Sequence, residues 1–161
     1  MNQLLAGCAA LVLCAVPALS QEKYTGPRPP KPDIPYLVHA SHLIPTEMVE
    51  ARQEEKKDDS VFVVPGAASP VKTPLAEPAF LMEADKLNPE RVDLWRLDTR
   101  GGQREIVLSK KAKRNGPRPI RVLVSHIDGR LYRIEVAQTL EPGEYSLSPS
   151  DSNQAFCFSV Y

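Results

Sequence analysis

The feature that most constrains the fold is an alternation of apolar and polar residues that runs from Ile120 to Tyr161. Apolar residues recur there at every second position, which is the period of a strand with one buried face. They are Ile120, Val122, Val124, Tyr132, Ile134, Val136, Tyr145, Leu147, Phe156, Phe158 and Val160. Turn-forming residues interrupt the alternation at Asp128-Gly129, at Pro142-Gly143 and from Pro149 to Asn153. The pattern therefore predicts two β-hairpins joined by a tight corner.

The first of these hairpins allows its register to be predicted, because residues opposite each other in an antiparallel pair share a face. A two-residue loop at Asp128-Gly129 would place Val122 opposite Glu135 and so mix apolar and charged side chains. A three-residue loop from Ile127 to Gly129 instead pairs Ile120 with Val136, Val122 with Ile134 and Val124 with Tyr132. It also gives Gly129 the left-handed position of the turn, where the lack of a Cβ removes the steric cost. We therefore expect the three-residue loop.

The corner between the two hairpins, Leu140-Glu141-Pro142-Gly143-Glu144-Tyr145, resembles the tyrosine corner of immunoglobulin-like and fibronectin type III-like domains. The resemblance covers Leu140 to Val160, and the chain lacks the Cys…Trp…Cys spacing of true immunoglobulin domains. It implies an antiparallel β-sandwich in which the Tyr145 hydroxyl bonds back to upstream backbone. With turn signals at regular spacing, we predict an all-β, immunoglobulin-like antiparallel sandwich of about seven to nine short strands over residues 36–161.

Residues 1–20 have the composition of a secretory signal peptide. Leu4 to Val16 is an unbroken run of apolar or small residues, and Ala18 and Ser20 occupy the −3 and −1 positions of a signal-peptidase site. The n-region is atypical because it carries no Lys or Arg. The apolar run is shorter than the roughly 20 residues that span a bilayer. We therefore expect cleavage between Ser20 and Gln21, a secreted or periplasmic location, and no transmembrane segment in the mature chain.

A second interpretation of the same region is a lipoprotein signal. Leu5-Ala6-Gly7-Cys8 matches a bacterial lipobox, in which the cysteine is acylated and becomes the first residue. Only seven residues precede Cys8, which leaves almost no hydrophobic segment before it. Lipidation at Cys8 is therefore the less favoured alternative.

Prolines divide the mature chain into two parts. Five of the twelve residues from Tyr24 to Pro35 are proline, and ten of the sixteen prolines lie between Pro27 and Pro78. Because proline fixes φ and lacks a backbone donor, we expect residues 21–35 to form an extended tether. The rest of the proline-rich half should contribute edge strands and long loops to the sandwich.

The segment from Thr46 to Asp59 has two interpretations. Thr46 is a suitable helix cap, and Glu47 would lie near the positive end of the helix dipole. Alternatively the segment is a strand that turns at Lys57 to Asp59 and returns as Val61 to Val64. We expect a short helix or an edge hairpin with a charged, solvated tip, and leave the choice open.

Composition and motifs argue against several classes of function. Twenty basic and twenty acidic residues give a net charge of zero, whereas nucleic-acid binding needs a basic excess. Nucleophile, metalloprotease, phosphate-loop and dinucleotide motifs are missing, so we expect neither an enzyme nor a cofactor. His39 and His42 lie too close to Pro35 and Pro45 for a helical metal site. Cys157, the one cysteine left after signal cleavage, is interpreted as a small buried strand residue.

Two features are candidate contact sites. Trp95, the single tryptophan, is expected in the core, but an exposed Trp95 would stack on a sugar or aromatic ligand. The stretch from Lys110 to Arg118 is a basic loop without acidic residues; its cationic members are Lys110, Lys111, Lys113, Arg114 and Arg118. The loop either contacts an anionic partner or is a solvated loop offset by the acidic residues between Glu47 and Asp59.

Three functions are compatible with these observations. The first is an exported, non-catalytic binding or envelope-assembly module, whose partner is an envelope or extracellular protein or a polysaccharide. Its contacts would be the basic loop, the tether or an open sheet edge, since an edge can recruit a partner strand. The second is a carbohydrate-binding or carbohydrate-acting envelope protein that uses Trp95. The third is a lipid-anchored structural protein of the envelope.

Overall fold

The computed structural model describes residues 23–111 and 114–161. The predicted signal peptide, Cys8 and Lys113 lie outside the described residues. Regular structure in the described part consists of thirteen β-strands and one short 3₁₀ turn, η1 (Pro89–Arg91). The all-β class is confirmed. There are more strands than predicted, because the proline-rich half adds strands of two to four residues that turn signals do not reveal.

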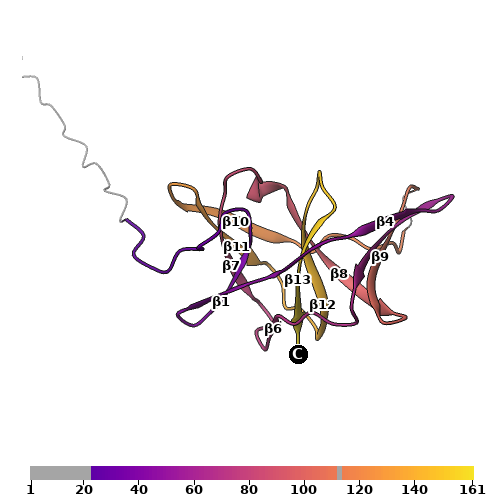
Figure 1. The fold of residues 1–161 in the computed structure, drawn as a ribbon, viewed down its shortest axis with the longest axis horizontal. Helices are drawn as coiled ribbons and strands as arrows, with labels where there is room; N and C mark the ends of the chain where they lie inside the picture. The colour runs from indigo at the N-terminus through magenta and orange to yellow at the C-terminus, as the bar shows by residue number, and fades with distance from the viewer. Residues whose placement is uncertain (1–22, 112–113) are drawn as a thin grey trace, which may run out of the picture.

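The smaller of two sheets has five antiparallel strands in the order β10-β11-β7-β1-β2. It occupies one end of the molecule, on the left of Figure 1. Its strands are β1 (Tyr36–His39), β2 (His42–Pro45), β7 (Ala79–Glu83), β10 (Val122–Asp128) and β11 (Leu131–Val136).

The larger sheet has eight strands in the order β3-β13-β12-β8-β9-β5-β4, and the short β6 pairs in parallel with the end of β13. Its strands are β3 (Glu47–Glu50), β4 (Arg52–Glu55), β5 (Asp59–Pro65), β6 (Lys72–Thr73), β8 (Val92–Arg100), β9 (Gln103–Ser109), β12 (Gly143–Pro149) and β13 (Gln154–Val160).

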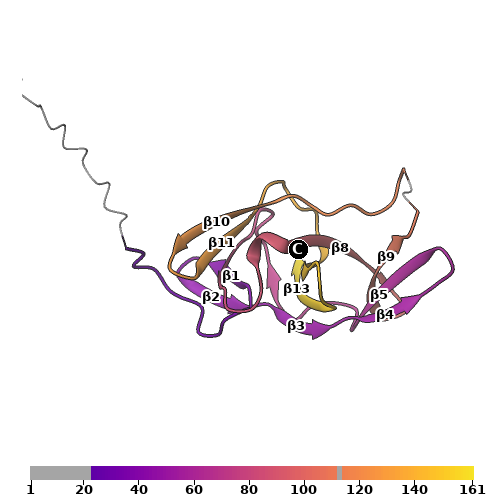
Figure 2. The same cartoon turned by 90° about the horizontal axis from the view of Figure 1, so that it is seen from above.

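The larger sheet curls until its two ends meet. β3 and β4 lie at opposite ends of the strand order, yet only Ala51 separates them in sequence. The chain from Glu47 to Glu55 pairs first with β13 and then with β5. At the change of partner, the Ala51 N–H donates to the Asn153 carbonyl at 2.8 Å. The strands therefore surround an interior, whose buried residues come from β5, β8, β9, β13 and Ala51. Figure 2 shows β3 continuing toward β4, which lies beside β5.

The helix hypothesis for residues 46–59 is wrong, and the hairpin alternative is correct. β4 and β5 pair antiparallel across a turn at residues 56–58. Every second residue of the segment faces inward, but the many charged residues obscure this alternation in the sequence. Glu47, Val49 and Ala51 face the interior of the curled sheet. Met48, on the opposite face of β3, is 54% exposed.

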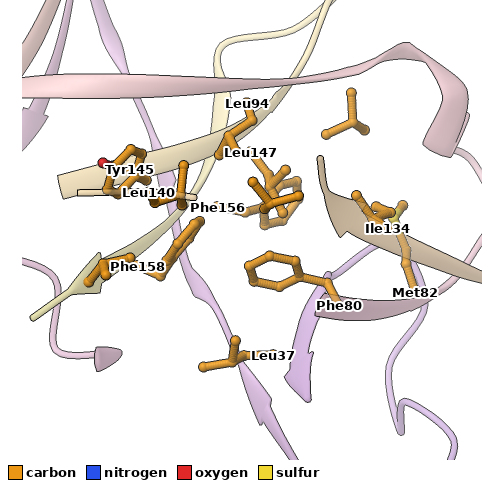
Figure 3. Close-up of a cluster of buried hydrophobic side chains, with 13 residues drawn as sticks. Leu37, Phe80, Met82, Leu94, Ile134, Leu140, Tyr145, Leu147, Phe156 and Phe158 are labelled. Carbon is orange, nitrogen blue, oxygen red and sulfur yellow. The ribbon is translucent and has the colours of Figure 1, made fainter. Parts of the chain in front are cut away.

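The main core lies between the two sheets and confirms a sandwich arrangement. Leu37, Phe80, Met82 and Ile134 of the smaller sheet contribute to one buried cluster with residues of β8, β12 and β13. Figure 3 shows this cluster, with Phe158 close to both Phe80 and Tyr145. The ring centroids lie 5.0 Å apart in the first pair and 5.6 Å apart in the second, within the range of favourable aromatic contacts.

Strand β13 is buried on both of its faces. Phe156, Phe158 and Val160 face the main core, whereas Ala155 and Cys157 face the interior of the curled sheet. Burial raises the pKa of the Cys157 thiol to about 11, against a lowering influence of Arg104. The thiol is therefore neutral near pH 7, which suits a packed rather than a reactive cysteine.

The predicted register of the β10–β11 hairpin is wrong by two residues. Val122 pairs with Val136, and Val124 pairs with Ile134. A register shift between His126 and Asp128 marks a β-bulge, which accommodates the extra residue. Because the shift is two residues, the apolar side chains keep the predicted face. The positive φ expected for Gly129 is present, at 59°.

The hydrogen bond expected of a tyrosine corner is present. The Tyr145 hydroxyl donates to the Glu141 carbonyl at 2.7 Å, and so ties the start of β12 to the preceding turn. Burial raises the pKa of Tyr145, so the phenol keeps the proton that this bond requires. Membership of an immunoglobulin-like family remains a prediction.

The segment expected to be a tether lies against the domain from Arg28 onward. Arg28 forms ion pairs with Glu83 and Asp128, and Pro29 is buried. The Asp33 carboxylate accepts hydrogen bonds from the backbone N–H groups of residues 85–87, at 2.8–3.0 Å. These contacts attach the chain before β1 to the β7 end of the smaller sheet.

Candidate ligand-binding cleft

The interior of the curled sheet opens to solvent as a cleft of about 450 Å³, here called the Trp95 cleft. Its apolar lining comes from five strands and the residue between β3 and β4: Ala51, Phe62, Val64, Trp95, Leu97, Ile106, Leu108, Pro149 and Ala155. Polar residues line the rest: Gln53, Asp93, Ser146, Ser148, Ser150, Asp151, Ser152, Asn153 and Gln154. Sites for small organic ligands combine apolar side chains with polar groups that orient the ligand.

The cleft exists because β8 and β9 diverge. They pair over only three residue pairs, from Asp98–Glu105 to Arg100–Gln103, next to a turn in which Gly101 and Gly102 have positive φ. Beyond these pairs, β8 follows β12 while β9 follows β5. The apolar residues that would otherwise meet in a closed core, among them Trp95, Leu97 and Ile106, therefore line an open space.

One wall of the cleft is a regular array set by the register of β8 and β12. Trp95 lies opposite Ser146, and Asp93 lies opposite Ser148. Residues two apart on a strand share a face, so all four side chains point into the same space. The two serine hydroxyls are hydrogen-bonded to each other at 2.8 Å. The wall thus combines an indole ring, two hydroxyl groups and a carboxylate.

Trp95 is neither fully buried nor fully exposed. It packs against the buried cluster of Ala51, Val64, Leu97, Ile106, Ala155 and Cys157, and it also lines the cleft. Trp95 therefore packs against core residues, as expected, and also lines a space that a ligand can enter, as the alternative required.

The two carboxylates of the cleft differ in their contacts. Asp151 forms an ion pair with the exposed Arg91 at 3.2 Å. Among the described residues, Asp93 has neither a hydrogen bond nor an ion pair to its side chain. No lysine, arginine or histidine of the described chain lines the cleft. Within residues 23–111 and 114–161, Asp93 is thus a half-buried carboxylate without a compensating cation.

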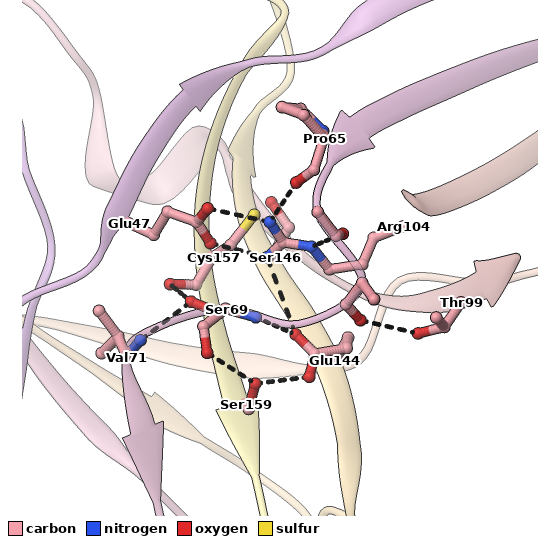
Figure 4. A network of polar contacts seen from close by, with 12 residues as sticks. Glu47, Pro65, Ser69, Val71, Thr99, Arg104, Glu144, Ser146, Cys157 and Ser159 are labelled. Atoms are coloured by element: carbon pink, nitrogen blue, oxygen red, sulfur yellow. Dashed lines mark hydrogen bonds and ion pairs between the residues drawn. The ribbon is translucent and has the colours of Figure 1, made fainter. Parts of the chain in front are cut away.

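The opposite end of the interior is closed by Arg104, whose side chain is completely buried. Its guanidinium donates two hydrogen bonds to the Glu47 carboxylate, at 2.7 and 2.9 Å, and further bonds to the carbonyls of Pro65 and Gly66, at 2.7 and 3.0 Å (Figure 4). These bonds span the gap between β3 and the end of β5. Arg104, on β9, therefore links β3 to the end of β5 across the interior.

A second carboxylate completes this buried network. Glu144 lies 3.7 Å from the Arg104 guanidinium and accepts hydrogen bonds from the Ser69 N–H at 2.8 Å and the Ser159 hydroxyl at 2.5 Å. Burial alone would lower the pKa of Arg104, but the hydrogen bond to Glu47 and nearby negative charge hold that pKa above its ordinary value. The network was not predicted from sequence. The sequence did contain a signal: Arg104 lies two and four residues before the inward-facing Ile106 and Leu108, so it shares their face of the strand.

The predicted basic loop is partly neutralised by the acidic hairpin tip. Lys110 forms an ion pair with Glu55 at 2.5 Å, and Lys111 forms one with Asp58 at 3.4 Å. The hydrogen bonds of Glu55, first that from Lys110, lower its pKa to about 2. Arg114 and Arg118 are exposed, and Arg118 lines a separate groove of about 570 Å³. The structure therefore places these cations outside the Trp95 cleft.

The remaining sequence features do not form a site. His39 and His42 are exposed and face each other across the β1–β2 hairpin. Over residues 23–111 and 114–161, His, Cys, Asp and Glu side chains form no group of three or more that could hold a metal ion. In the same ranges, no helix has the length and apolar character needed to cross a membrane.

Comparison with known proteins identified no relative of this chain. The chain matches no family model, no curated protein and no solved structure. The Trp95 cleft is therefore interpreted from its own residues.

Proposed function

We propose that the chain is an exported, non-catalytic binding module that holds a carbohydrate in the Trp95 cleft. The observation that carries the proposal is the wall on which Trp95, Asp93 and the hydrogen-bonded pair of Ser146 and Ser148 lie side by side. A sugar presents an apolar face of C–H groups and a rim of hydroxyls. The indole ring suits the first, and the Asp93 carboxylate and the Ser148 hydroxyl suit the second.

The size of the cleft supports a small ligand or a short stretch of a chain. Its volume of about 450 Å³ falls within the usual range of ligand sites, roughly 300–1,000 Å³. The other surfaces proposed for contact have less support. Lys110 and Lys111 are already paired with acidic side chains, and the proline-rich segment lies against the domain from Arg28 onward.

Replacing Trp95 with Ala is expected to weaken glycan binding at least tenfold. Loss of an aromatic contact in a partly desolvated site costs about 1.5 kcal/mol or more, and 1.4 kcal/mol corresponds to a factor of ten. The ligand is first identified by titrating the wild-type protein with soluble oligosaccharides, using the fluorescence of its single tryptophan. Affinities of the variants are then compared by calorimetry.

Tyr161→Ala serves as the matched control, because Tyr161 is an aromatic residue that is 68% exposed and does not line the cleft. It should bind glycans like the wild type. Equal loss of affinity in both variants, or a wild-type protein that no oligosaccharide affects, would contradict the proposal. Shortened oligosaccharides after long incubation would contradict its non-catalytic part.

The proposed export rests on the signal-like segment from Met1 to Ser20. Mass spectrometry of the mature protein from a secreting host should show Gln21 as its first residue. An acylated Cys8 at the N-terminus would instead support the lipid-anchored alternative. An uncleaved Met1 on protein that stays inside the cell would contradict export.

A further inference from the structure

We infer that the Trp95 cleft prefers a glycan with a free amino group, and that the Asp93 carboxylate is the partner of that group. The inference rests on the proposed carbohydrate function and names the class of sugar. It starts from the charges of the cleft. Asp93 and Asp151 are acidic, and the described lining residues include no basic side chain.

Of the two carboxylates, Asp93 is the one available to a ligand. The Arg91 guanidinium neutralises Asp151 at 3.2 Å on the exposed rim. The Asp93 side chain has no such partner among the described residues and is half-buried. A carboxylate in a partly desolvated site interacts more strongly with an opposite charge than one in bulk water. A protonated amine would therefore bind here, whereas a uronic acid would be repelled.

The position of Asp93 relative to Trp95 fits a substituent on a stacked sugar. The two residues share a face of β8 at i and i+2, which corresponds to about 7 Å along a strand. A sugar ring lying on the indole can therefore bring an amino substituent to the carboxylate. Ser148, opposite Asp93, provides a hydroxyl for a neighbouring ring position, and its hydrogen bond to the buried Ser146 holds it in place.

The test compares four soluble tetrasaccharides by calorimetry: β-1,4-linked glucosamine, its N-acetylated form, β-1,4-linked glucose and galacturonate. The glucosamine tetramer should bind about tenfold more tightly than the N-acetylated form, because acetylation removes the positive charge. This preference should shrink at high salt. The galacturonate tetramer should bind most weakly.

Asp93→Asn should bind the glucosamine tetramer and its N-acetylated form with equal affinity, so that the preference for glucosamine is lost. Asp151→Asn is the matched control and should keep the preference, because its carboxylate is already paired. Thermal unfolding of both variants verifies that they are folded. If the glucose tetramer binds and glucosamine has no advantage, or if Asp93→Asn retains that advantage, the inference is wrong while the proposed function stands. If none of the four binds, both are overturned.

Discussion

Replacing Arg104 with Met should lower the free energy of unfolding by about 3–5 kcal/mol, because it leaves two partly buried carboxylates and two backbone carbonyls without their donor. The guanidinium has no exposed surface and donates to Glu47 and to two backbone carbonyls. Methionine fills a similar volume, so most of the loss comes from the unpaired acceptors rather than from a cavity. Urea unfolding followed by circular dichroism measures the change.

The control for Arg104→Met is Arg100→Met, four residues away at the end of β8. The Arg100 side chain is 79% exposed and pairs with Glu105 at 3.5 Å, so its loss should change stability by less than about 0.5 kcal/mol. A double-mutant cycle with Glu47→Gln should show coupling between Arg104 and Glu47, since the two groups are in direct contact. Similar stability of Arg104→Met and Arg100→Met would contradict the role given to the buried network.

Phe158→Ala should also destabilise the fold, by about 3–5 kcal/mol, because it opens a cavity between the two sheets. Phe158 is completely buried, and its ring contacts Phe80 of the smaller sheet and Tyr145 of the neighbouring strand. Phe158→Leu keeps much of the volume and should cost less than about 1.5 kcal/mol. The same urea experiment measures both variants.

The comparison for the core prediction is Leu123→Ala on β10, where the side chain is 48% exposed. Its effect should be small, because little apolar surface is lost from the interior. If Phe158→Ala unfolds at the same urea concentration as Leu123→Ala, the two sheets do not depend on this contact. The sandwich arrangement would then need another explanation.

The strands that could be predicted from sequence are those with an uninterrupted period of two. The hairpins after Ile120 have local pairing and clear turn residues. The face of each β10 side chain was correct although the register was not, because a two-residue shift preserves alternation and a bulge gives no compositional signal.

What could not be predicted depends on contacts between distant parts of the chain. The Trp95 cleft exists because the Glu47–Glu55 segment changes partner at Ala51 and because β8 and β9 diverge, and neither event has a local signature. The charged residues on the outer face of the Glu47–Glu55 segment are also typical of a solvated helix. Trp95 was identified as a candidate from its residue type alone, whereas Asp93 and Ser146 became candidates only once the strand register was known.

The change of partner at Ala51 also bears on when this chain can fold. Glu47 to Glu50 pair with residues 154–157, about a hundred residues later in the chain, and β6 depends on the end of the same late strand. Until β13 has been synthesised, β3 has no neighbour and β12 lacks one side of its sheet. Neither the main core nor the curled sheet can then close. A chain that is exported while it is being made would thus close its main core and its curled sheet only after β13 is available, and the addition of β13 would complete both.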